Sequence, residues 1–135
     1  MKKTSVIIAK IRRLNLNSES TTLFYELEEV KRKFVEKSIE FIYEEEPIFC
    51  FFFKTDYWWV ITNFRIIVSE NYSISYHFFE EVKSIHLKDI FENEIIKEEC
   101  ENIEIKLENG DEVKLNVEKK TWHSVYNLVK FLISS

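Results

Sequence analysis

The chain has 135 residues, of which 45% are hydrophobic and 32% charged, with a net charge of −5, one Gly and two Cys. A chain of this length buries about two-thirds of its unfolded surface as one domain, and its composition excludes collagen-like, low-complexity and disulfide-scaffold proteins. The unusual feature is the 16% of aromatic residues, twelve of them Phe, beside a single Ala, Ala9. This balance favours strands over helix bundles, and we predict a single domain over residues 1–135.

Residues 1–17 form a basic arm without an acid, and its cations are Lys2, Lys3, Lys10, Arg12 and Arg13. The +5 of this arm leaves −10 for the remaining residues. The arm can attract an anionic lipid surface, or lie against carboxylates of its own chain, and the second interpretation is favoured because exposed charges are weak evidence of function. Its apolar spacing over residues 4–16 fits a strand or a helix, with a small preference for a strand.

The apolar stretch that begins at Val6 stops at Lys10, which is too short for a signal peptide. Since no segment approaches the roughly 20 apolar residues that span a bilayer, we expect a cytoplasmic protein. Cys50 lies in an apolar run, where a buried and inert thiol is expected, and Cys100 lies between two glutamates, which raise a thiol pKa. Neither is a candidate nucleophile.

Residues 20–37 predict a helix, because Leu23, Leu27, Val30 and Phe34 recur at helical spacing between charged residues. Residues 38–46 predict a second short helical turn that ends at Pro47. The N-terminal arm and helix, residues 1–43, thus precede a core over residues 44–135.

Strands are predicted over residues 48–53, 57–62 and 64–69, and eight aromatic residues fall within 49–64. Because strand side chains alternate between faces, this part of the sheet is apolar on both faces. One of Trp58 and Trp59 must then face away from the core, so both are candidate partner-binding residues. The alternative, slightly favoured, is that helix 20–37 covers this face.

Further strands are predicted over residues 73–79, 82–87 and 89–96, and a hairpin over 101–117. A three-residue loop, Glu108 to Gly110, pairs Ile105 with Val113, and it also sets Lys106 against Glu112 and Glu104 against Lys114. The chain closes with an amphipathic helix over residues 119–133.

Catalytic signatures are missing from this sequence. The three histidines, His77, His86 and His123, have no metal-ligand neighbour at helical spacing, and the glutamate runs are explained by a solvated surface. The single Gly excludes a Gly-rich phosphate loop. We therefore expect no enzyme activity, no cofactor and no metal.

The segment Tyr57 to Val68, YWWVITNFRIIV, together with ISY at 74–76 and EEVKSI at 80–85, resembles a bacterial PH-like (pleckstrin-homology-like) domain. The resemblance covers roughly residues 44–133. It implies an α+β, mainly β fold: a partly open seven-stranded barrel or sandwich capped by the C-terminal helix, here with an extra N-terminal helical segment.

Members of this family that bind phosphoinositides usually use basic residues around the loop between the first two strands. Here that loop, residues 54–56, offers only Lys54 beside an acid. Arg65 matches the family's arginine, and its place after the Thr62-Asn63 corner favours a role in closing the hairpin by bonding to backbone or carboxylate.

We expect a non-enzymatic interaction module that binds a protein or peptide. The alternative is peripheral binding to anionic lipid through the five cations of the arm, joined by Lys54. Nucleic acid is not an expected partner of so acidic a chain, and a homo-oligomer is compatible with the sequence.

Overall fold

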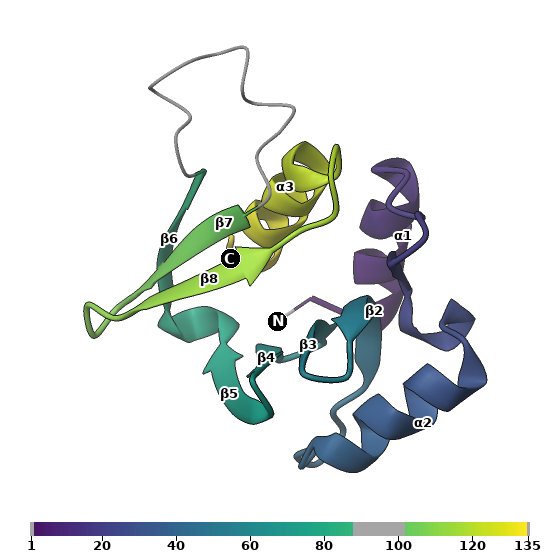
Figure 1. Cartoon of the computed structure of the whole chain (residues 1–135). Coiled ribbons are helices and arrows are strands. Elements are labelled where there is room, and N and C mark those ends of the chain that lie inside the picture. The colour runs from purple at the N-terminus through teal and green to yellow at the C-terminus, as the bar shows by residue number, and fades with distance from the viewer. Residues whose placement is uncertain (1, 88–101, 135) are drawn as a thin grey trace. The chain divides into compact units, whose positions relative to one another are not determined.

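The computed structural model describes residues 2–87 and 102–134 (Figure 1). It divides into two units, Met1–His77 and Phe78–Ser135, which are described separately below. The first unit joins the N-terminal segment to the strands that follow Pro47.

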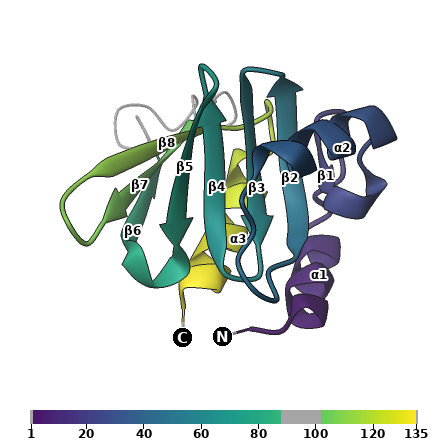
Figure 2. The same cartoon turned by 90° about the horizontal axis from the view of Figure 1, so that it is seen from below.

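The first unit is built on a five-stranded antiparallel sheet in the order β1-β2-β3-β4-β5 (Figure 2). Its strands are β1 (Thr21–Leu23), β2 (Pro47–Lys54), β3 (Tyr57–Thr62), β4 (Arg65–Glu70) and β5 (Ser73–Phe78). The strands predicted over 48–53, 57–62, 64–69 and 73–79 are confirmed. All six residues of β3 are buried, so the sheet is apolar on both faces, as predicted.

Three helical segments precede β2: α1 (Thr4–Arg13), the 3-10 turn η1 (Phe24–Glu26) and α2 (Glu29–Ser38). The preference for a strand in the arm is wrong: a helix forms, and it buries Ile7 and Ile11, four residues apart on one face. The predicted helix over 20–37 is wrong in its first half, because α2 begins only at Glu29. There Thr21 to Leu23 pair with β2 instead, since a ladder with a buried strand outweighs local helical spacing.

The region between α2 and β2 is irregular, so the helical turn predicted over 38–46 is wrong. We call residues 39–46 the strap. The strap begins extended at Ile39 and contains Glu44 in a left-handed conformation, with φ 64°. The Glu45 N–H donates to the Ile42 carbonyl at 3.0 Å within the strap, and other backbone groups of the strap bond to side chains of the sheet, as described below.

The second unit contains η2 (Phe79–Glu81), a three-stranded antiparallel sheet and α3 (Trp122–Ile133). The sheet strands are β6 (Val82–Leu87), β7 (Asn102–Leu107) and β8 (Glu112–Asn116). The predicted register of the last hairpin is confirmed, with Ile105 opposite Val113 and Glu104 opposite Lys114. The loop closes through Gly110 at φ 94°.

The C-terminal helix forms as predicted, starting three residues later, and packs against β6, β7 and η2 (Figure 1). The strand predicted over 89–96 lies outside the described residues.

The architecture is therefore α+β, with antiparallel sheets of five and three strands and helices at both ends of the chain. The described residues form eight strands, not seven, because β1 adds to the edge of β2, and they form no closed barrel. In the stretches 2–87 and 102–134, no helix has the length and hydrophobicity needed to cross a membrane.

Candidate functional site

The two adjacent tryptophans of β3 are both buried, with Trp58 1% and Trp59 0% exposed. The Trp59 ring lies 5.9 Å from the Phe49 ring and 5.8 Å from the Phe51 ring, measured between centroids. Of the two alternatives for these residues, the one in which a tryptophan stays exposed is therefore wrong. A partner cannot reach either indole on the surface as it stands.

Trp58 is buried because the chain covers its own sheet. Phe24, Leu27, Val35 and Ile39 pack in one apolar cluster with the β2, β3 and β4 side chains around Trp58. The Phe34 ring meets Phe52 edge-on at 6.4 Å. The intramolecular cover expected from residues 20–37 is present, although Val35 rather than Val30 supplies its buried valine.

The basic arm lies on the first unit as α1, whose buried face holds it in place and whose other face is exposed. Arg12 and Arg13 are exposed, and the Arg12 guanidinium donates to the hydroxyl of Tyr25, itself 54% exposed. Lys10, Arg12 and Arg13 fall in the last turn, where cations also offset the partial negative charge of the helix end.

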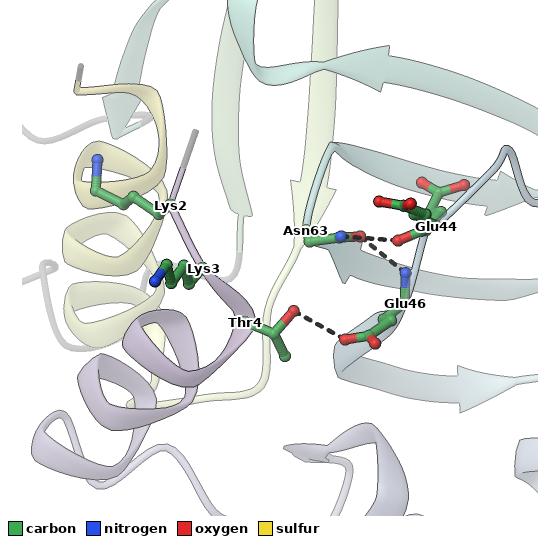
Figure 3. A pocket seen from close by; sticks show the side chains of 7 residues that line it. Lys2, Lys3, Thr4, Glu44, Glu46 and Asn63 are labelled. Atoms are coloured by element: carbon green, nitrogen blue, oxygen red, sulfur yellow. Dashed lines mark hydrogen bonds between the residues drawn. The ribbon is translucent and has the colours of Figure 1, made fainter.

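Lys2 and Lys3 line an open pocket of about 570 Å³ beside the start of α1 (Figure 3). Its opposite wall carries Glu44, Glu45 and Glu46, and the Thr4 hydroxyl donates to the Glu46 carboxylate at 2.9 Å. The pocket is therefore mixed in charge, which weakens it as an anion site.

The sixth candidate for lipid binding, Lys54, lies at the far end of β2 from this pocket. The strand has eight residues, so its ends lie about 23 Å apart at 3.3 Å per residue. The Lys54 ammonium pairs with Asp56 at 3.6 Å. The structure therefore does not join Lys54 to the basic arm.

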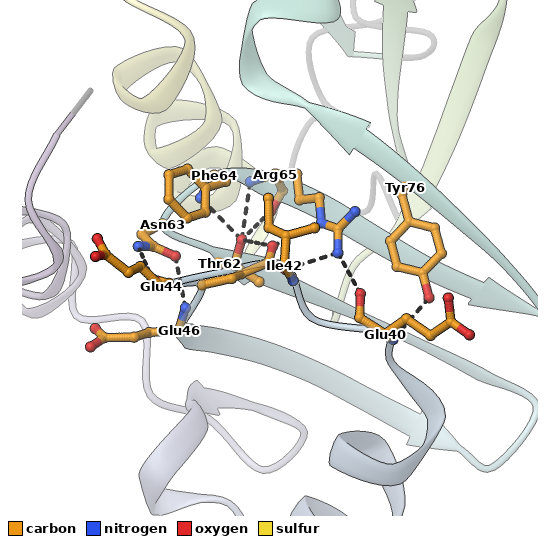
Figure 4. Close-up of polar contacts among 10 residues, drawn as sticks. Glu40, Ile42, Glu44, Glu46, Thr62, Asn63, Phe64, Arg65 and Tyr76 are labelled. Carbon is orange, nitrogen blue, oxygen red and sulfur yellow. Dashed lines mark hydrogen bonds and ion pairs between the residues drawn. The ribbon is translucent and has the colours of Figure 1, made fainter.

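Arg65 and Glu45 form an ion pair whose side chains are 7% and 0% exposed. The guanidinium donates to both carboxylate oxygens at 2.8 Å, from Nε and Nη2, and Nη2 also donates to the Glu40 carbonyl at 2.7 Å (Figure 4). The central carbon of the guanidinium, Cζ, lies 4.3 Å from the centre of the Tyr76 ring. We call this arrangement the clasp.

The Thr62-Asn63 corner completes the clasp. The Thr62 hydroxyl donates to Glu45 at 2.7 Å and accepts the Arg65 backbone N–H at 3.0 Å. The Asn63 side chain accepts from the Glu46 N–H and donates to the Glu44 carbonyl (Figure 4). Arg65 thus bonds to backbone and carboxylate, as the sequence predicted, and the bonds fasten the strap to the hairpin.

Two exposed aromatic residues lie at the end of the sheet opposite the clasp. Phe53 is 63% and Tyr72 71% exposed, and Thr55 Oγ1 lies 3.4 Å from the Tyr72 hydroxyl. The Asn71 N–H donates to the Asp56 carbonyl at 2.8 Å, so the β2–β3 and β4–β5 turns are joined. We call Phe53, Thr55 and Tyr72 the aromatic tip.

Both aromatic side chains of the tip are held outward by unusual backbone. Phe53 falls between the β2 residues that pair with Trp58 and Tyr57, at a register shift, and such bulges re-aim a side chain. Tyr72 has φ 65° in a two-residue turn, a position that usually takes Gly. Sequence reasoning missed the tip, and its detectable signal was Asn71-Tyr72 between two strands.

Cys50 is fully buried, and this burial raises the pKa of its thiol far above the usual range, against a smaller opposing effect of Lys31. His77 and His86 each bond a serine two residues earlier on the same strand. Among the described residues, no group of three His, Cys, Asp or Glu side chains is arranged to hold a metal ion.

Comparison with known proteins gives no relative: no family model, no curated protein and no solved structure matches the chain.

Proposed function

We propose that this chain is a non-enzymatic binding module of PH-like architecture that engages a protein or peptide partner through the aromatic tip. The single observation that carries the proposal is the pair of outward aromatic rings, Phe53 near the end of β2 and Tyr72 in the β4–β5 turn, beside the bond that joins the two turns. Exposed aromatics of this size are typical of interaction surfaces, where they become the residues that dominate binding.

The order of elements supports the PH-like part of the proposal. From Pro47 onward the described residues form a meander of four strands, an antiparallel sheet of three strands and a terminal helix, β2 to α3. This is the strand number and helix position that the resemblance implies. The function is not inherited from that likeness, because one fold hosts many functions.

The backbone at Tyr72 supports the choice of the tip as the binding surface. A bulky residue with positive φ costs free energy that Gly or Asn would avoid, and such strain concentrates at functional sites. The 71% exposed ring gains little from the folded chain in return. A partner that buries the Tyr72 ring would offset the free energy of this strain through apolar burial.

Photocrosslinking in cells tests the proposal. A photoreactive phenylalanine at position 72 should give one discrete crosslinked product, which Phe53→Ala should reduce at least about tenfold, since burying a Phe side chain is worth about 1.5–3 kcal/mol. The matched control is the same probe at Tyr43, which is 88% exposed on the strap at the other end of the sheet. Identical products from both positions, or none from position 72, would refute it.

Binding to anionic lipid through α1 is the second candidate. The specific observation is that α1 and its flanks expose Lys3, Arg12 and Arg13, together with Val6 at 43%, on a stretch without acids. Vesicles containing phosphatidylserine should sediment the chain, and Arg12→Glu with Arg13→Glu should abolish this at low salt. Equal sedimentation of both chains would remove this candidate.

A further inference from the structure

One face of the five-stranded sheet is covered by α2 and the residues next to it (Figure 2). Its buried side chains come from three neighbouring strands, and we call them the α2 face: Cys50, Phe52, Trp58, Val60 and Ile67. Phe24, Leu27, Val35 and Ile39 lie against it, with Phe34 partly buried beside them. These residues, together with α2, which carries Phe34 and Val35, are the cover.

The helix in the cover is held by few contacts. Val35 is its one fully buried residue, and Val30, on the same helix, is 73% exposed. Its charged side chains pair along the helix itself, as in the 2.9 Å pair of Lys33 with Glu29. Few buried apolar contacts are typical of segments that open locally, below the free energy of global unfolding.

The cover also has fixed points on both sides. Leu23 pairs with Phe49 in the β1–β2 ladder before it, and the clasp holds Glu45 on Arg65 after it. Between these points the backbone is extended at Leu27, ψ 144°, and at Ile39, ψ 136°, on either side of α2. The helix can therefore lift while both of its anchors remain bonded to the sheet.

A buried donor under the cover is unsatisfied. The Nε1–H of Trp58 has no hydrogen-bond acceptor among the described residues, although the residue is only 1% exposed. Buried polar groups are paired in the great majority of cases, and an unpaired one penalises the closed state. Opening gives this N–H water or the acceptor of a partner.

From these observations we propose that α2 is a releasable cover, and that the α2 face which it leaves binds an amphipathic helical segment of another protein. This surface is separate from the aromatic tip, and the proposal stands whether or not the tip binds a partner. The intact chain is then the closed state, in which α2 occupies the site as an internal ligand.

The contacts of the cover define the chemistry of the partner helix. It should present an aromatic side chain that meets Phe52 edge-on, as Phe34 does, beside a β-branched residue in the place of Val35. A cation one turn before them should lie over the Phe52 ring, as the Lys31 ammonium does at 5.5 Å. An amphipathic helix in an apolar groove is a recurrent mode of peptide recognition.

Cys50 is a built-in probe of opening, since its thiol is buried in the α2 face and protonated while the cover is closed. With Cys100→Ser as the background, the rate of reaction with Ellman's reagent measures access to Cys50 alone. At low urea this rate should be nearly independent of urea concentration, because local opening exposes little surface. A rate that rises with urea as steeply as global unfolding would overturn the proposal.

Matched valine variants separate local opening from general destabilisation. Val35→Ala should speed the reaction about tenfold at zero urea, whereas Val30→Ala on the exposed side of α2 should change it less than twofold. Val68→Ala removes the same two methyl groups from a residue of β4 that is 4% exposed and outside the α2 face. Val68→Ala should also change the rate less than twofold. If Val35→Ala and Val68→Ala both accelerate the reaction in proportion to the global stability that each loses, local opening of the cover is contradicted.

Binding to the uncovered face is tested with a labelled peptide of residues 24–38. It should bind the full Val35→Ala chain about tenfold more tightly than the wild-type chain, because the internal ligand competes less well. The control peptide carries Phe34→Ser and Val35→Ser and should not bind. Equal binding of the two peptides would refute the proposal that the α2 face binds a helix. So would the absence of binding by the peptide of residues 24–38 to a chain in which Cys50 reacts by local opening.

Discussion

Replacing Tyr72 with Gly should stabilise the protein while it removes a proposed binding residue. Tyr72 has φ 65°, in the left-handed region, and its ring is 71% exposed. A side chain in this region strains the folded backbone by about 1–2 kcal/mol, and Gly removes this strain. Gly also loses more conformational entropy on folding, which offsets about 0.5–1 kcal/mol of the stabilisation. The 3.4 Å contact with Thr55 adds little. The expected net gain is about 0.5–1 kcal/mol.

Thermal and urea unfolding followed by tryptophan fluorescence measure this gain, which corresponds to a rise in Tm of about 2–5 °C. Tyr72→Asn should also be at least as stable as the wild type, since Asn tolerates positive φ, whereas Tyr72→Val should be less stable. Loss of about 1 kcal/mol in Tyr72→Gly, or equal stability of Val and Gly at this position, would refute the strain. With the photoreactive phenylalanine placed at position 53 instead, the crosslinked product should be lost in Tyr72→Gly in spite of the higher stability of this variant.

Three further substitutions test the interior and the last hairpin. Glu45→Ala leaves the Arg65 guanidinium buried without its carboxylate and should cost about 3–5 kcal/mol in urea unfolding; a cost below about 1 kcal/mol would show that the clasp does not hold the strap. Cys50 keeps its proton when folded because burial raises its pKa, while the unfolded thiol ionises near pH 8.5. Stability should therefore fall above that pH, by up to about 1.4 kcal/mol per unit, and Cys50→Ala should remove this slope. Gly110→Ala should cost about 1 kcal/mol through its φ of 94°, with no clash because nothing lies within 4 Å of the added Cβ; equal stability of the Ala variant would contradict this.

The last hairpin shows what a sequence predicts well. Each alternative loop length gives a different set of opposed residues, and only the three-residue loop matches apolar with apolar and Lys with Glu. The choice depends on near neighbours alone. It therefore needed no knowledge of the rest of the fold.

The N-terminal half shows what the sequence could not decide. The spacing of Leu23 and Leu27 is helical, but Leu23 lies in a strand because it pairs with Phe49. This partner is far along the chain, so local spacing could not indicate the pairing. Likewise, an apolar outer face at Trp58 requires a cover without specifying whether the chain or a partner supplies it. Phe53 was indistinguishable from its buried neighbours, since one register shift turns it outward.

The pairing of β1 with β2 makes everything between Leu23 and Phe49 the loop of one long hairpin. Once the short ladder forms, the entropy of closing that loop is already lost, whether its interior is ordered or not. Because closure entropy grows only slowly with length, by about 0.6 kcal/mol per doubling, this hairpin tolerates insertions and deletions between its strands. The helix-bearing loop is accordingly the natural place for this protein to gain sequence, provided that the residues that cover Trp58 and the Glu45 of the clasp stay in place.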